Sequence, residues 1–66
     1  MANIIYERIL KLIEEQRLSK AKVEIACGLG NGTIESWKDG NPTISKLEAV
    51  ANVLGVSVED LVRKEM

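Results

Sequence analysis

Few residues in this sequence could carry out chemistry on a substrate. The 66 residues include no histidine and a single cysteine, Cys27, and no candidate nucleophile stands beside a base. The glycine-rich segment 28–32 lacks the lysine and the preceding strand of a nucleotide-binding loop. Soft ligands are too few for a zinc site, and no cofactor or small-molecule substrate is implied. We therefore expect neither an enzyme nor a metal site, and we interpret Cys27 as a small buried hydrophobic residue.

The side chains best suited to recognition are the short polar ones that follow this glycine-rich turn. Ile34 and Trp37 are three residues apart, so on a helix they share one face, and we expect Trp37 to pack in the core rather than stack on a base. The opposite face carries Asn31, Gly32 and Ser36, which are short and accessible. The sequence therefore offers a polar recognition surface rather than a catalytic centre.

The overall charge counts modestly against a nucleic-acid partner. Nine basic and ten acidic residues give a formal net charge of −1, whereas affinity for DNA depends on Lys and Arg side chains that neutralise phosphates. The distribution is uneven, because residues 17–46 hold five basic and three acidic residues, a net charge of +2, and the remaining residues together carry −3. Any positive potential is expected to be local to the middle of the chain.

Length and composition limit the architecture. A chain of 66 residues has room for one domain with one small core, so we expect a single domain over 1–66. No run approaches the roughly 18 consecutive apolar residues of a membrane span, and the N-terminus lacks the pattern of a signal peptide. We expect a cytoplasmic protein with no membrane partner.

Hydrophobic spacing predicts helices in the first part of the chain, and no segment alternates for long enough to indicate a sheet. The first helix is expected over 3–16, with Asn3 as its N-cap. Its core-facing stripe consists of Ile5, Ile9, Leu12 and Ile13. A second helix should begin at Lys20, where Ser19 can cap it, and stop at Gly28.

Three further helical segments follow. A tight turn leads into the third, which should run from about Asn31 to Lys38, and a loop over 39–42 precedes the fourth, with Thr43 as its N-cap and Gly55 at its end. The stripe of the fourth helix consists of Ile44, Leu47, Val50, Ala51 and Leu54. The fifth begins at Ser57, whose side chain can cap it, and acidic residues suit its first turn: Glu59 and Asp60.

Taken in order, these features resemble the helix-turn-helix of the phage repressor and Cro family. The resemblance covers essentially the whole chain and rests on Leu18-Ser19, Glu24, the run from Gly28 to Gly40, Pro42-Thr43-Ile44, the spaced Leu47, Val50 and Ala51, the run Leu54-Gly55-Val56-Ser57-Val58, and Leu61. It implies an all-α, compact, five-helix, lambda-repressor-like DNA-binding domain, with the helix-turn-helix over about 19–38.

The same resemblance assigns roles to individual residues. It implies a recognition helix that begins at Asn31 and lies in the major groove with its first residues against base edges. The base-reading positions of the family fall on Asn31, Gly32 and Ser36. Its phosphate-contacting positions fall on Lys20, on the loop residues Asn41 and Thr43, and more loosely on Lys38.

Three departures from the family pattern are informative. Arg17 stands where many members have a glycine at the exit of the first helix. Glu24 stands where alanine is common, which places a carboxylate near an expected packing surface without an evident partner. A buried arginine–glutamate pair of relatives is replaced at both ends, by Ile13 and Lys38. Because replacing both partners leaves no uncompensated charge, we expect Ile13 to pack near Trp37 and Lys38 to turn to solvent or phosphate.

Several residues keep two interpretations at this stage. Asn31 can pair with adenine, which we favour, or cap the helix. Gly32 indicates either a close approach of its backbone to DNA or a helix that starts late. Ser36 can bond to a base edge or to a carbonyl one turn back. Glu35 is expected to be a solvated or intramolecular charge, because a carboxylate repels phosphates; if it faces DNA, its partner would be cytosine N4.

The leading functional hypothesis is a small transcriptional regulator, encoded by a prophage or mobile element and associated with the nucleoid. It would bind a double-stranded DNA operator as a homodimer, with half-sites about 34–36 Å apart. The helix over 57–66 is the expected self-association surface, through Val58, Leu61, Val62 and Met66, although Leu61 is almost as well explained by packing in the core. The alternative keeps the fold without DNA: a protein-interaction module, such as an antitoxin or anti-repressor component.

Overall fold

The computed structural model describes residues 4–62, and within that range the chain is all-helical, as predicted. The helices are α1 (Ile4–Glu15), α2 (Lys20–Cys27), α3 (Thr33–Ser36), α4 (Ile44–Leu54) and α5 (Val58–Val62). Asn3 and Met66, to which the sequence assigned a capping and a self-association role, lie outside the described residues. No helix in the described part of the chain is long and apolar enough to cross a membrane.

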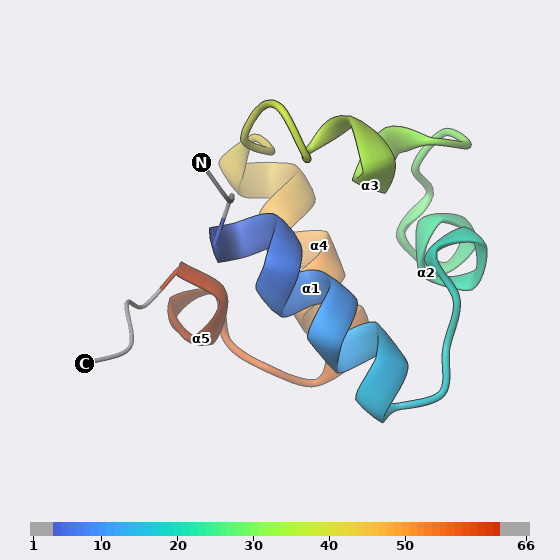
Figure 1. Ribbon diagram of the computed structural model, residues 1–66, viewed down its shortest axis with the longest axis horizontal. Helices are drawn as coiled ribbons and strands as arrows, with labels where there is room; N and C mark the ends of the chain where they lie inside the picture. Colours follow the sequence, from blue (N-terminus) through green and yellow to red (C-terminus); the bar gives the residue numbers. More distant parts are fainter. Residues whose placement is uncertain (1–3, 63–66) are drawn as a thin grey trace.

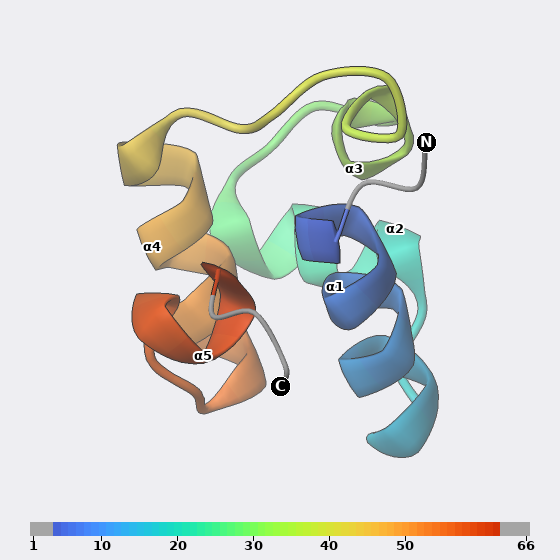
Figure 2. The same cartoon turned by 60° about the vertical axis from the view of Figure 1, so that its left-hand side comes forward.

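The helices form a small bundle in which α3 and α5 lie far apart. Figure 1 shows α1 crossing the front of the molecule, with α4 behind it, α2 and α3 towards one side and α5 towards the other. In the turned view of Figure 2, α3 again lies away from α5, and a long loop leads from α3 over the top of the molecule to α4. The contacts agree, since α2 packs against α3 and α4, and α5 packs against α1 and α4.

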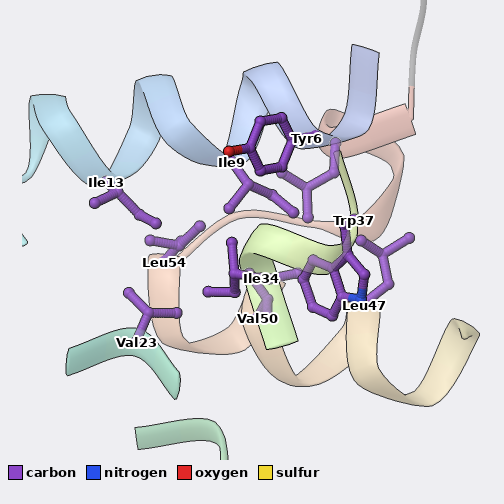
Figure 3. Packing of buried hydrophobic residues seen from close by; sticks show 11 residues of the cluster. Tyr6, Ile9, Ile13, Val23, Ile34, Trp37, Leu47, Val50 and Leu54 are labelled. Atoms are coloured by element: carbon purple, nitrogen blue, oxygen red, sulfur yellow. The ribbon is translucent and has the colours of Figure 1, made fainter. Parts of the chain in front are cut away.

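One hydrophobic core joins all five helices, but its stripe on α1 differs from the predicted one. On α1 the buried side chains are Tyr6, Ile9 and Ile13, while Ile5 and Leu12 are only half-buried at the edge of the core. The stripe is therefore centred nearer Tyr6, because this face of α1 lies over α4 and α3 (Figure 3).

The stripe of α4 is confirmed except at its first residue. Its buried side chains are Leu47, Val50, Ala51 and Leu54. Ile44 instead has 66% of its surface exposed, because it is the first residue of the helix and lies beyond the edge of the core.

The exit from α1 has the glycine-type geometry despite the arginine. Arg17 adopts a left-handed conformation with φ of 57°, the one non-glycine residue with positive φ among residues 4–62. Its amide donates to the carbonyl of Glu14, and the amide of Leu18 donates to that of Ile13 at 2.9 Å, a pattern that closes the helix end. The exit is thus the same as a glycine would give, at the cost of strain at a residue with a Cβ.

The ends of α4 and the start of α5 are closed mainly by local contacts. Gly55 ends α4, as predicted, and adopts the left-handed conformation. The side-chain amide of Gln16 adds a contact from α1, because it donates to the carbonyl of Leu54 at 2.7 Å. At α5, Ser57 and Asp60 cap each other: the Asp60 amide donates to Ser57 Oγ, and the Ser57 amide donates to an Asp60 carboxylate oxygen.

Burial of Leu61 corrects one part of the predicted self-association surface. Its side chain is fully buried in the core, 0% exposed, so the alternative of core packing holds for this residue. Of the other residues in that surface, Val58 is half-buried and Val62 is 42% exposed. A single turn of helix can place only one of its faces against the core, and in α5 Leu61 occupies that face.

Candidate nucleic-acid interface

The second helix is positioned by the caps that the sequence predicts. Ser19 has an extended backbone, and its hydroxyl accepts a hydrogen bond from the amide of Lys22 at 3.1 Å. Gly28 ends the helix with φ of 72°, and its amide donates to carbonyls of the last turn. Lys20 is consequently the first residue of α2.

The third helix is shorter than predicted and begins later. It spans only Thr33–Ser36, so the expectation of a helix from Asn31 to Lys38 is wrong at both ends. Gly32 is the N-cap, with φ of 85°, and Asn31 belongs to the preceding turn. Gly32 is therefore explained within the protein by a late helix start, because a side chain at this φ would be strained even though nothing lies within 4 Å of a Cβ placed there.

Glu24 supplies the cap that Gly32 lacks. Glu24 is 4% exposed, and its two carboxylate oxygens accept hydrogen bonds from the amides of Gly32 at 3.2 Å and Ile34 at 2.9 Å. These amides belong to the four that a helix start leaves without an intrahelical partner. The carboxylate whose partner was not evident from the sequence thus ties α2 to the first turn of α3.

The inner face of α3 is anchored in the core. Ile34 is 0% exposed and Trp37, at the C-terminal cap, is 4% exposed, which confirms the prediction that Trp37 packs rather than stacks on a base. Figure 3 shows the indole beside Leu47 of α4, with Tyr6 of α1 above it. With Glu24 at one end and Trp37 at the other, a helix of one turn is held from both sides.

The three predicted base-reading residues lie on the outside of this segment. Asn31, Gly32 and Ser36 are all exposed. Asn31 does not cap the helix, since Gly32 occupies that position. Ser36 Oγ donates to the carbonyl of Thr33 at 2.5 Å, which is the intramolecular alternative considered for this residue. The hydroxyl still has acceptor lone pairs available to a partner.

Glu35 lies in an intramolecular cluster with residues of two other helices. Its Oε1 atom accepts from Lys20 Nζ at 2.5 Å and from the hydroxyl of Tyr6 at 2.9 Å. The hydrogen bond from Lys20, followed by that from Tyr6, lowers the pKa of the Glu35 carboxyl group. The hydrogen bond from Lys20 to Glu35 in turn raises the pKa of Lys20. The hydrogen bond from Tyr6 to the same carboxylate raises the pKa of Tyr6. We call this the Tyr6–Glu35–Lys20 cluster.

The cluster bears out the intramolecular interpretation of Glu35 and adds a residue that sequence reasoning missed. Tyr6 is three and seven residues before Ile9 and Ile13, so helical spacing could have placed it on the core face. Nothing local in the sequence links it to Glu35, which is 29 positions away.

The other predicted phosphate contacts lie on the chain between α3 and α4. Lys38, Asn41 and Thr43 are exposed. Lys38 is turned to solvent, as expected, whereas Thr43 caps α4 by accepting from the amide of Lys46 at 3.4 Å. Asn41 lies in the loop that leads over the molecule from α3 to α4 (Figure 2).

The predicted neighbour of Ile13 is wrong. Ile13 is buried, but Figure 3 places it beside Leu54, at the opposite end of the core from Trp37. Ile13 lies near the end of α1, whereas Tyr6 and Ile9, earlier on the same face, lie above Trp37 and Ile34. An apolar residue can therefore fill this site without any contact to the segment around Lys38.

Cys27 is half-buried at the edge of the core, and burial raises the pKa of its thiol. It therefore behaves as the hydrophobic packing residue that the sequence suggested. No group of three or more His, Cys, Asp and Glu residues that could hold a metal ion occurs among residues 4–62.

Comparison with protein families gives a match over nearly the whole chain. The family model described as the Cro/C1-type HTH DNA-binding domain matches residues 8–65, which include α2 to α5 and most of α1. Comparisons with curated proteins and with solved structures gave no match.

Proposed function

This chain belongs to the family of Cro/C1-type helix-turn-helix DNA-binding domains, and from that premise we propose that it recognises a specific double-stranded DNA sequence and thereby represses transcription. Family membership supports DNA binding and a part in transcription regulation. The observation that carries the more specific proposal is the segment 30–36. Its inner side is tied down by Glu24 and Ile34, while Asn31 and Ser36 are exposed on its outer side.

Base recognition is assigned to Asn31, Gly32 and Ser36. An asparagine amide can donate to and accept from the edge of adenine, and such a pair contributes about 1–3 kcal/mol of discrimination. Gly32 carries no side chain, so the backbone there can come close to a base or phosphate. Because the turn is held by buried hydrogen bonds, these groups are oriented before DNA arrives, which lowers the entropy lost on binding.

Phosphate contacts are assigned to Lys20, Lys38, Asn41 and Thr43. Three of them lie on the chain between α3 and α4, and Lys20 is joined to α3 through Glu35. The two lysines among them belong to the local excess of positive charge in residues 17–46, together with Arg17, Lys22 and Lys46. They would set the register of the domain on the duplex without reading sequence.

The assembly proposed is a homodimer on a two-fold symmetric operator. One such domain offers few base contacts, whereas specific interfaces usually bury about 1,000–2,500 Å² of protein surface. Because Leu61 is in the core, the exposed apolar side chain that remains on α5 is Val62, and Ile4 at the start of the neighbouring α1 is 44% exposed. The resemblance to phage repressors makes a prophage or mobile element the proposed setting.

The test is selection from a pool of random duplexes on the immobilised protein, with sequencing of what is retained and anisotropy measurements on the selected site. We expect a palindromic site, weaker binding as salt rises, and a further loss of affinity in Asn31→Ala and Ser36→Ala. Asn52→Ala is the matched control, because Asn52 is exposed on the later part of α4.

Two outcomes would contradict the proposal. Failure to retain any duplex at low salt would eliminate DNA binding and favour the protein-interaction alternative. Retention without sequence enrichment, unaffected by Asn31→Ala and Ser36→Ala, would leave a non-specific DNA-binding domain.

A further inference from the structure

The Tyr6–Glu35–Lys20 cluster places a carboxylate in the midst of the proposed DNA-binding surface. Lys20 begins α2, Glu35 lies on α3, and their side chains are 43% and 51% exposed, so the pair stands at the surface. Tyr6 is 9% exposed and reaches the same oxygen from the core side. The carboxylate is thus held between a buried phenol and an exposed ammonium group.

The Lys20–Glu35 ion pair is not explained by stability alone, because its side chains are 43% and 51% exposed. An exposed ion pair contributes little to folding, because water screens the charges and two long side chains lose freedom. The negative charge of Glu35 also weakens binding to DNA, because it repels the phosphates. The pair also changes the charge that the surface offers to DNA, because the Glu35 carboxylate already neutralises the Lys20 ammonium group.

We propose that Glu35 is a positioning residue for DNA binding that holds Lys20 in an intramolecular ion pair and so withholds this cation from the phosphates of non-specific DNA. The inference rests on the proposed function. Tyr6 keeps the carboxylate directed towards α2 by donating to the oxygen that also accepts from Lys20. Sequence-independent affinity is thereby reduced, and binding depends more on contacts to base edges.

The salt dependence of binding reports this directly. Each phosphate contact that releases a counterion adds about 0.9 to the slope of log K against log salt concentration. In Glu35→Gln the ammonium of Lys20 is freed, so we expect the slope on a random duplex to steepen by about 0.9. That slope difference corresponds to a roughly threefold larger loss of affinity between about 50 and 200 mM salt.

The experiment is anisotropy on a random-sequence duplex over a series of salt concentrations, with Glu35→Gln, Lys20→Gln and the double variant. Removal of one negative charge also acts at a distance, so the double variant is decisive. We expect Lys20→Gln alone to change the slope little. In the double variant, the steeper slope caused by Glu35→Gln should disappear, because Lys20 is no longer there to contact a phosphate. Glu59→Gln is the matched control, because Glu59 is exposed on α5, far from α3 in both views.

Tyr6→Phe gives a second measurement that keeps all the charges. Without the phenol the carboxylate is free to leave Lys20, and we expect a smaller increase in slope than in Glu35→Gln.

Three results would overturn the proposal. First, the salt slope of Glu35→Gln could equal that of Glu59→Gln. Second, the steeper slope could persist in the double variant, which would assign it to the loss of a negative charge and not to Lys20. If either result occurs while the unmodified protein binds its selected site, this inference fails and the proposed function stands. If neither the unmodified protein nor any variant binds a duplex, the inference and the proposed function fail together.

Discussion

Glu24 is a carboxylate at a position where two helices pack, and its partners explain how a buried charge is tolerated there. A buried ionised group is costly unless it is hydrogen-bonded. Here the amides of Gly32 and Ile34 are both directed at it, and both would otherwise be unpaired at the start of a helix. The carboxylate whose partner was not evident from the sequence therefore orders the segment that presents Asn31.

Replacement of Glu24 should loosen this segment. We expect Glu24→Ala to lower the free energy of unfolding by about 1–3 kcal/mol, because two amides lose their acceptor. Glu24→Gln, which retains one acceptor oxygen, should cost less. The check is urea denaturation together with hydrogen exchange of the Gly32 and Ile34 amides, with the exposed Glu14→Gln as control. Unchanged exchange at both amides in Glu24→Ala would show that the cap is unimportant.

Arg17 is strained by its left-handed backbone, and glycine should relieve the strain. We expect Arg17→Gly to raise the free energy of unfolding by about 0.5–1 kcal/mol, which is the penalty of a Cβ at positive φ less the greater freedom of glycine in the unfolded chain. Arg17→Ala is the matched control: it removes the same side chain but keeps the Cβ. Thermal unfolding would count against the explanation if Gly and Ala gave equal stability.

The hydrogen bond from Tyr6 to Glu35 should be visible in a titration. Tyr6 is the only tyrosine in the chain, so phenolate absorbance reports it alone. We expect its pKa above the ordinary 10.0, and a return towards that value in Glu35→Gln. Since the folded pKa is raised, this contact stabilises the fold fully below pH 10.0 and is lost as pH rises through the raised pKa. Identical midpoints in the two proteins would contradict the cluster.

Among the elements, α3 depends most on its surroundings. A helix of one turn cannot sustain itself, because nucleation fixes several residues for one hydrogen bond. Its start is set by Glu24 from α2, its end by Trp37 in the core, and its middle by Glu35 with α1 and α2. The helix is thus a product of the core rather than of its own sequence.

By contrast, α2 and α4 carry their own start signals, and these can be compared. Ser19 accepts from Lys22 at 3.1 Å and Thr43 from Lys46 at 3.4 Å. We expect Ser19→Ala to cost about 1 kcal/mol of stability and Thr43→Ala less, because its hydrogen bond is longer. Ser45→Ala, at an exposed position inside α4, should be neutral. Denaturation curves in which all three variants coincide would remove both caps from the account.

At the scale of the whole molecule, α5 closes the core on the side away from α3. Leu61 is its buried residue and Val62 its exposed one, so neighbouring positions separate packing from association. The short α5 is joined to α1 as well, where an Arg8 guanidinium nitrogen donates to the carbonyl of Asp60 at 2.7 Å. A partner that pairs through α5 would leave the helix-turn-helix unobstructed.

Truncation of Leu61 should therefore act on folding. We expect Leu61→Ala to cost about 2–5 kcal/mol, a large part of the stability of so small a domain. Val62→Ala should cost under about 0.5 kcal/mol but weaken self-association if α5 forms the dimer contact. Urea denaturation and sedimentation equilibrium separate the two. A Leu61→Ala protein that is fully stable but monomeric would reverse the assignment.

The sequence by itself determined the features whose partners are close along the chain. The caps at Ser19 and Thr43 and the glycine that ends α2 are made within four residues, so local chemistry is sufficient to predict them. Helical spacing likewise placed Trp37 and most of α4 in the core. The family match agrees with that pattern over residues 8–65.

Only the tertiary structure decided the contacts between helices. The bonds of Glu24 to the start of α3 span 8 and 10 positions, and those of Glu35 to Lys20 and Tyr6 span 15 and 29. No local sequence pattern predicts such pairs, because each forms only when the core has set the distance between two helices. For the same reason the late start of α3 and the burial of Leu61 were settled by packing: a single turn has too little periodicity of its own to state which residues face inward.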